Sequence, residues 1–334
     1  APLSSYGSGA SDYYKILVQI ADTSFSSKKL CDIHDRTISK DGLLSAIKSL
    51  GTIYSANNIA FNPLVHMVLA GFLGWDFYIS YAVCRWNKKN KGVFEDVIQI
   101  VSEIEELGSL AVLSIIRNTV KPDISDGISL DIKDAFHPLI DEQTVVPNNC
   151  DFSSKLMIIT GSNMSGKTTY MRTVAINMVL AYTGAGVCAS SFSVPRMKIF
   201  TSMRIMDDVA GGISTFYAEI LRIKEMAEYV SAGKEPRAIC FIDEIFKGTN
   251  SADRIVGAKE ALKKLSDGNS MVIVTTHDFE LCELETASGK QADNYHFEEY
   301  YEDGELKFDY KIRDGRCTTR NAMAILKMAG LVQN

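Results

Sequence analysis

The sequence predicts an α/β protein in which a mainly parallel sheet follows an all-helical region. Three observations support this fold class. Residues 41–117 carry apolar side chains at spacings of three and four, which is typical of helices. The stretch 118–149 is rich in Pro, Asp and Asn, and the helical period stops there. Short β-rich segments then alternate with helical ones, as in a parallel sheet covered on both faces. We therefore expect two domains, residues 1–120 and 121–334.

Composition narrows the classes of function. The 334-residue chain is 46% hydrophobic and 23% charged, as ordinary soluble proteins are. Its net charge of -6 gives no overall electrostatic reason to bind nucleic acid, so such binding would need a local basic patch, a partner or an absent segment. The seven cysteines are scattered without a C-x-x-C pair, which argues against disulfides or zinc. This cysteine pattern predicts a reducing, cytoplasmic setting, and the start of the sequence does not resemble a secretory signal.

Within the helical region, the apolar stretch 52–84 has two interpretations. No Lys or Arg interrupts it, it exceeds the ~20 residues that cross a bilayer, and Arg85 and further lysines follow it. A membrane-tethered protein is therefore one alternative. His66 and above all Asp76 favour a helix buried in protein, because a carboxylate inside a membrane is costly without a partner. We expect a buried helix and no stable membrane association.

The β-rich part begins with a phosphate-binding motif. Residues Gly161 to Thr168 match G-x-x-x-x-G-K-[ST], after an apolar segment and before a helix expected from Gly166 to about Tyr182. Inward-pointing N–H groups and the helix N-terminus would hold phosphates. Lys167 would reach the β- and γ-phosphates, and Thr168 would supply a hydroxyl to Mg²⁺. The candidates for nucleotide contact here are Gly161, Ser162, Asn163, Met164, Ser165, Gly166, Lys167, Thr168 and Thr169.

Two later segments supply the catalytic candidates. AICFIDEI carries Asp243 and Glu244 after its apolar run, where a carboxylate can hold the Mg²⁺ of a phosphate loop. Asp243 is therefore a candidate metal ligand with Thr168, and Glu244 is expected to orient and deprotonate the attacking water. His277 ends a third strand and could sense or polarise the γ-phosphate. Adjacent carboxylates usually mark solvated turns and a lone His is usually structural, but their positions at strand ends favour the site.

The segment from Asp207 to Ile220, DDVAGGISTFYAEI, supplies a further anion-binding candidate. A glycine pair leads into Ser214, which can cap the helix that follows. Capping alone would explain this serine, yet an exposed helix N-terminus with a serine is also an anion site. Ser214 could therefore serve the nucleotide of a second subunit.

Four motifs in this order, TGSNMSGKTTYMR, DDVAGGISTFYAE, DEIFKGTNSADR and TTHD, resemble the ATPase domain of the MutS family, the mismatch-repair clamps related to ABC ATPases. The resemblance spans about Phe136 to Leu331. It implies an ABC-type P-loop NTPase fold that hydrolyses ATP with Mg²⁺ in a homodimer with composite sites. Ser214 would act in trans, Asn163 would stabilise the loop, and His277 would match the histidine of the switch strand.

The resemblance implies further residues and a cellular role. Adenine would lie near Val145, Val146 and Tyr310, although Tyr310 could equally be an ordinary strand residue. The helical region resembles the family's lever, which passes the nucleotide state to a DNA-encircling clamp. DNA would be bound through regions partly absent here. The alternative is a nucleotide-switched adaptor or ribosome-associated ATPase without mismatch specificity.

Several features depart from the full repair protein. The chain has no room for a mismatch-recognition domain, and the spacing of Phe297 and Glu299, Phe-x-Glu, falls after the expected ATPase core in an acidic stretch. The loop lacks the usual Pro and second Gly, and Phe246 and Lys247 stand where Gly-Arg is usual. We therefore expect a divergent MutS-related branch with intact phosphate chemistry.

Overall fold

The computed structural model describes residues 4–39, 42–58, 62–203, 215–246, 251–284, 292–302 and 305–317. The chain divides into two compact units, Ala1–Ser109 and Leu110–Asn334. The boundary expected from the sequence lies after residue 120, whereas this division falls within the long helix α6 (Val93–Ile116). The helical period therefore continues past the point where the packing of the first unit ends.

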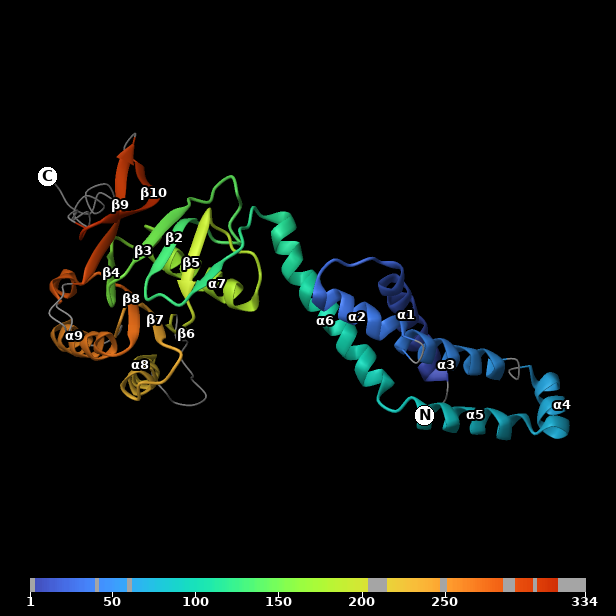
Figure 1. Ribbon diagram of the computed structural model, residues 1–334. Helices are drawn as coiled ribbons and strands as arrows, with labels where there is room; N and C mark the ends of the chain where they lie inside the picture. The colour runs from blue at the N-terminus through green and yellow to red at the C-terminus, as the bar shows by residue number, and fades with distance from the viewer. Residues whose placement is uncertain are drawn as a thin grey trace. The chain divides into compact units, whose positions relative to one another are not determined.

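The second unit is built on a six-stranded, mainly parallel sheet (Figure 1). Strands β9, β4, β8, β7 and β6 lie side by side and parallel in that order, and β10 pairs with β9 antiparallel at one edge. Every residue of β4 and β8 is buried, as expected for strands covered on both faces. The bounds are β4 Leu156–Thr160, β6 Lys198–Ser202, β7 Ala238–Asp243, β8 Ser270–Thr275, β9 Asp293–Glu302 and β10 Glu305–Asp314.

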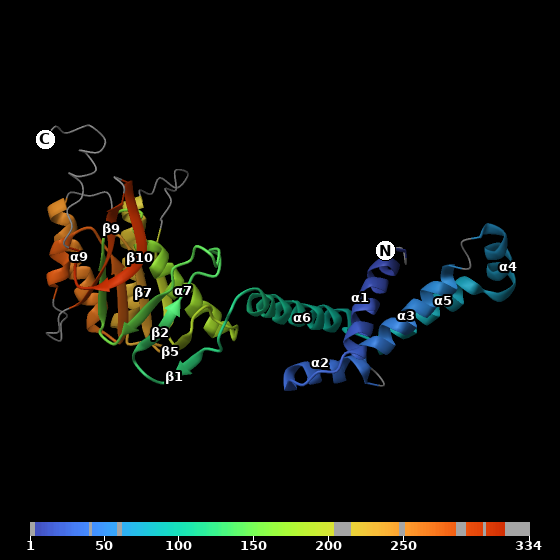
Figure 2. The ribbon, with the colours of Figure 1, turned by 90° about the horizontal axis from the view of Figure 1, so that it is seen from above.

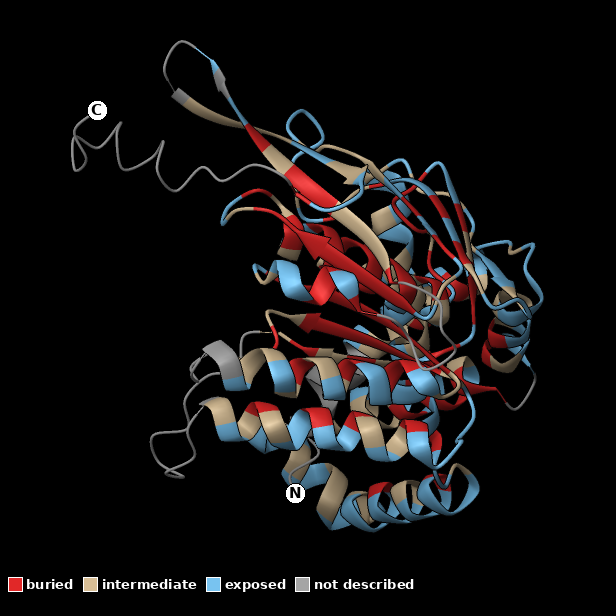
Figure 3. Cartoon of the chain, turned by 90° about the vertical axis from the view of Figure 1, so that its left-hand side faces the viewer, coloured by how far each residue is buried: buried red, intermediate tan, exposed pale blue. Residues whose placement is uncertain are grey.

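Helices cover both faces of this sheet (Figure 2). Successive residues of β4 show the two layers, because side chains alternate along a strand. Met157 packs in a core with α7 (Lys167–Thr183), whereas Ile158 packs in a core with α8 (Thr215–Ser231) and α9 (Ser251–Asp267). Figure 3 shows buried strands beside helices whose outer sides are exposed. The loop to α7 follows the last residue of β4, so it lies at the edge of the sheet where the parallel strands have their carboxyl ends.

A second sheet, of four strands in the order β1-β5-β2-β3, packs on the α7 side. The sequence indicated only that the helical period ends in residues 118–149, so the strands there are an addition to the prediction. Buried side chains of this sheet, including Leu130 and Phe152, join the core that contains α7. The bounds are β1 Asp123–Ser125, β2 Leu130–Ala135, β3 Asn148–Phe152 and β5 Ser191–Pro195.

The first unit is helical, as predicted. Leu17, Ile47 and Val97 lie in its apolar core, and the indole Nε1 of Trp86 donates to the Ala46 carbonyl and to Ser49 Oγ, at 3.0 Å each. The two hydrogen bonds join the helix of Trp86 to the helix that carries both Ala46 and Ser49. The bounds are α1 Ser4–Asp22, α2 Lys28–Ile38, α3 Leu43–Asn58, α4 Pro63–Leu73 and α5 Trp75–Lys89, followed by the start of α6.

The expectation of a buried helix within residues 52–84 is wrong for α4. This helix has no buried residue, and Phe72 is 86% exposed. Gly74, in the left-handed conformation at φ 59°, ends α4 and separates it from α5, so the apolar stretch covers parts of three helices. Within the described residues, no single helix has the length and composition to cross a membrane, and α4 and α5 pass that test only as a pair bent by 81°. His66 Nε2 lies at hydrogen-bond distance, 3.0 Å, from Asp76 Oδ1 across this bend.

Candidate active site

The phosphate loop predicted from the sequence connects β4 to α7. Gly161 and Gly166 have φ values of 144° and 108°, which favour glycine. Space also requires glycine at residue 161, because a Cβ there would lie 2.7 Å from the Phe297 carbonyl oxygen. Met164 has φ 69° and is a non-glycine exception. The loop is thus tightly curved, as the motif requires.

Lys167 lies inside this curve. Its ammonium donates hydrogen bonds to the carbonyl oxygens of Gly161, at 2.8 Å, and Ser162, at 2.7 Å. The side chain is buried among these groups, with the residue 5% exposed. An ammonium that is held by carbonyl oxygens can exchange them for phosphate oxygens, which are stronger acceptors because they are charged. The loop therefore holds a cation ready for an anionic ligand.

Thr168 and Asp243 meet across the sheet edge, as a metal site requires. Thr168 Oγ1 donates to both carboxylate oxygens of Asp243, at 2.9 and 3.1 Å. Among the described residues there is no cluster of three or more His, Cys, Asp or Glu side chains suited to a metal. One hydroxyl and one carboxylate nevertheless fit Mg²⁺, which keeps several waters and binds substrate phosphates. The pair is therefore a chemically suitable ligand set.

Thr275 is a supporting residue that no motif in the sequence indicated. Its Oγ1 donates to Asp243 at 2.7 Å, and the same oxygen accepts from the Glu244 N–H at 3.2 Å. Asp243 and Thr275 are register partners on β7 and β8. The only sequence signal was the position of Thr275 at a strand end, which does not identify its partner.

Asn163, Glu244 and His277 come together from three different segments. His277 Nε2 lies 2.9 Å from Asn163 Oδ1 and 3.2 Å from Glu244 Oε1. With hydrogen on Nε2, the imidazole donates toward both oxygens and orients the Glu244 carboxylate. Glu244 has φ 56°, an unusual value for a non-glycine residue and one that is often found at functional sites. The geometry joins the phosphate loop to the groups that end β7 and β8.

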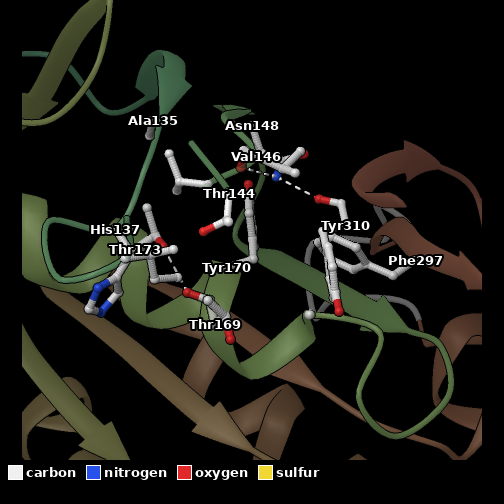
Figure 4. Close-up of a pocket in the computed structure, with 13 residues that line it drawn as sticks. Ala135, His137, Thr144, Val146, Asn148, Thr169, Tyr170, Thr173, Phe297 and Tyr310 are labelled. Atoms are coloured by element: carbon white, nitrogen blue, oxygen red, sulfur yellow. Dashed lines mark hydrogen bonds between the residues drawn. The ribbon is translucent and has the colours of Figure 1, made fainter. Parts of the chain in front are cut away.

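A pocket of about 370 Å³ opens beside the start of α7 (Figure 4). Its lining includes the predicted Val145, Val146 and Tyr310, together with Thr169 and His137. Burial and the nearby Arg172 lower the pKa of His137, which favours a neutral imidazole. The pocket is therefore mainly apolar and uncharged, a suitable environment for a planar base.

Asn148 holds Tyr310 in place and was not predicted. Tyr310 has φ 55° and lies in an irregularity of the β9–β10 pairing. Asn148 Nδ2 donates to the Tyr310 carbonyl at 2.9 Å (Figure 4). Asn148 Oδ1 accepts from the Ile312 N–H at 2.9 Å. Tyr310 thus departs from regular strand geometry, and the Asn148 amide contacts its carbonyl at the pocket wall.

Two of the residues singled out in the sequence, Ser214 and Lys247, lie outside the described residues; α8 begins at Thr215.

The position expected for Phe297 and Glu299 is wrong. They were expected to follow the ATPase core, but β9 pairs directly with β4. Phe297 is 1% exposed and lies in the core with α7. These two residues are therefore part of the surroundings of the phosphate loop.

Comparison with known proteins gives a consistent family match. Residues 157–334 match the model of MutS domain V. The DNA mismatch repair protein MutS of Aquifex pyrophilus is 32% identical over 238 residues, covering 70% of this chain and 27% of that protein. Proteins of the same name from Staphylococcus carnosus and Persephonella marina are 34% and 35% identical, with the same coverage. The matched part of the chain thus spans about a quarter of the length of these relatives.

Proposed function

The chain belongs to the MutS family, and from that premise we propose that it binds ATP with Mg²⁺ in the loop between β4 and α7 and hydrolyses it. The observation that carries this proposal is that two groups of side chains meet at one loop. Thr168 bonds to Asp243. Asn163 and Glu244 both contact His277 beside the same loop. A metal-ligand pair and a carboxylate oriented by an imidazole, both beside a buried lysine, suit phosphoryl transfer to water.

Each group has a separate part in the proposed reaction. Lys167 exchanges its two carbonyl partners for phosphate oxygens. Thr168 and Asp243 would hold Mg²⁺, which when bound neutralises charge on the phosphates. Glu244 orients the attacking water and accepts its proton, and His277 fixes the position of that carboxylate. Asn163 holds the imidazole from the loop side.

The base is proposed to stack on Tyr310. We expect Tyr310→Ala to weaken ATP binding about tenfold, because base–aromatic stacking contributes about 1–3 kcal/mol. Tyr310→Phe retains the ring and should bind ATP as the unmodified protein does. Titration with ATP and with inorganic triphosphate separates the contributions, since only ATP has a base. Equal weakening for both ligands would contradict stacking.

We propose further that two ATPase units complete each other's sites, with Ser214 acting on the partner's nucleotide. Mixing Ser214→Ala with Lys167→Ala chains should restore hydrolysis, because a mixed dimer then contains one intact composite site. Mixing Lys167→Ala with Glu244→Ala is the matched control: each site of that dimer still lacks one essential group. Activity in the first mixture no higher than in the second would refute the trans role. Gel filtration with a slowly hydrolysed ATP analogue would show whether nucleotide drives dimer formation.

The nucleotide cycle is proposed to control binding of DNA, as the names of the relatives suggest. The net charge of -6 gives the chain no overall attraction to DNA. We therefore keep the alternative proposal of a nucleotide-switched adaptor or ribosome-associated ATPase. Binding to branched, mismatched and perfect duplexes and to RNA, over a range of salt concentrations, separates the two. ATP-dependent, salt-sensitive binding to duplex DNA supports the first function. Equal or stronger binding to RNA supports the second.

A further inference from the structure

The phosphate loop is anchored to β9 by a hydrogen bond between two side chains. Ser162 Oγ donates to Glu299 Oε2 at 2.6 Å. Glu299 is 8% exposed, so this carboxylate is largely removed from water. A hydrogen bond to a buried carboxylate is short and strong compared with one between neutral groups. Neither residue has a part in the chemical steps proposed above.

Ser162 is the residue on which the internal bonds of the loop converge. Its carbonyl oxygen accepts from Lys167 Nζ at 2.7 Å and from Ser165 Oγ at 2.9 Å. Its hydroxyl is held by Glu299. The position of Glu299 therefore affects the peptide that faces the lysine ammonium.

The backbone of β9 supports the same part of the loop. Thr160, at the end of β4, pairs with His296, and the Phe297 carbonyl oxygen occupies the space that a Cβ on Gly161 would need. Two neighbouring loop residues are thus fixed by β9, Gly161 by close backbone approach and Ser162 by the carboxylate.

A carboxylate beside a phosphate loop repels a bound triphosphate, so its charge by itself weakens binding. Any gain in nucleotide binding from Glu299 must therefore come from the position in which it holds the loop. We propose that Glu299 is a positioning residue that holds Ser162, and through it the phosphate loop, in the conformation that accepts nucleotide. When Lys167 turns from the Ser162 carbonyl toward phosphate, the anchor keeps the peptide in place, which lowers the cost of ordering the loop on binding.

This inference rests on the proposed function, and binding and steady-state kinetics test it together. Ser162→Ala and Glu299→Ala should each raise the ATP Kd and KM about tenfold, the effect of losing one hydrogen bond to a charged group. The kcat should stay within about twofold, because Glu244 and His277 are unchanged. The double variant should be no weaker than either single variant, since both remove the same bond. Glu299→Gln keeps an acceptor for the Ser162 hydroxyl and should restore binding.

Glu302→Ala is the matched control, because Glu302 is an exposed carboxylate of the same strand paired with Lys307. It should leave Kd and KM unchanged. Thermal unfolding of every variant detects general destabilisation, and Glu299→Gln keeps the test valid if Glu299→Ala fails to fold. Unchanged affinity in Glu299→Ala, additive losses in the double variant, or a Gln variant as weak as Ala would each overturn the inference alone. An unmodified protein that binds no nucleotide would overturn the proposed function and this inference with it.

Discussion

Lys167→Ala is expected to abolish ATP binding. The ammonium is the only cation that this loop encloses among the described residues, and it already lies between two inward carbonyls at 2.7 and 2.8 Å. Hydrogen bonds to charged groups contribute about 1.5–3 kcal/mol each. Losing two such bonds to phosphate should raise Kd by at least about a hundredfold. Calorimetric titration with a slowly hydrolysed ATP analogue measures this change directly.

Lys155→Ala is a suitable control because Lys155 precedes the same strand at its opposite end. Its ammonium donates to the carbonyls of Asp267 and Gly268, far along β4 from the loop. This variant should bind nucleotide with unchanged affinity. If Lys167→Ala also binds normally, the phosphate site lies elsewhere and the proposed function is wrong.

Glu244→Gln is expected to keep nucleotide binding and to lose turnover. The amide preserves the shape of the side chain and its contact with His277, but it cannot accept the proton of the attacking water. General-base catalysis typically contributes about 10²–10⁴-fold, so kcat should fall by about a thousandfold. Single-turnover hydrolysis separates this loss from a change in product release.

The division of roles between Lys167 and Glu244 is itself testable. Glu260→Gln, on the exposed side of α9, controls for loss of a carboxylate and should leave kcat unchanged. Equal loss of nucleotide affinity in Lys167→Ala and Glu244→Gln would refute the division. A Glu244→Gln chain that retains full turnover would require a different base, and the geometry then leaves His277 as the nearest candidate.

Much of this site was accessible from the sequence because its signals are local. The G-x-x-x-x-G-K-T pattern specifies a backbone turn, a lysine and a hydroxyl within one short segment. Asp243 and Glu244 end an apolar run, and the carboxyl ends of parallel strands share one sheet edge. The structure brings these groups together, with Thr168 bonded to Asp243 and His277 beside Glu244.

Other features depended on distant parts of the chain. Residues 118–149 carry turn-forming residues, and their strands form only because β5 and the α7 core give their buried side chains a surface to pack on. The apolar residues of α4 predicted burial, but none of them is buried and several, such as Phe72, are mostly exposed. Hydropathy measures the tendency of a side chain to leave water, but it does not specify which surface will pack against that side chain.

Local pattern therefore predicted the helical and α/β regions, the tight turn between β4 and α7 and the carboxylates at the strand ends, since periodicity and motif spacing act over a few residues. Only the folded chain decided that Thr275 supports Asp243, that Asn148 turns Tyr310 toward a pocket, and that Glu299 anchors Ser162. Each of these bonds joins residues more than 30 positions apart. Such pairs are selected by strand register and packing, which no short stretch of sequence encodes.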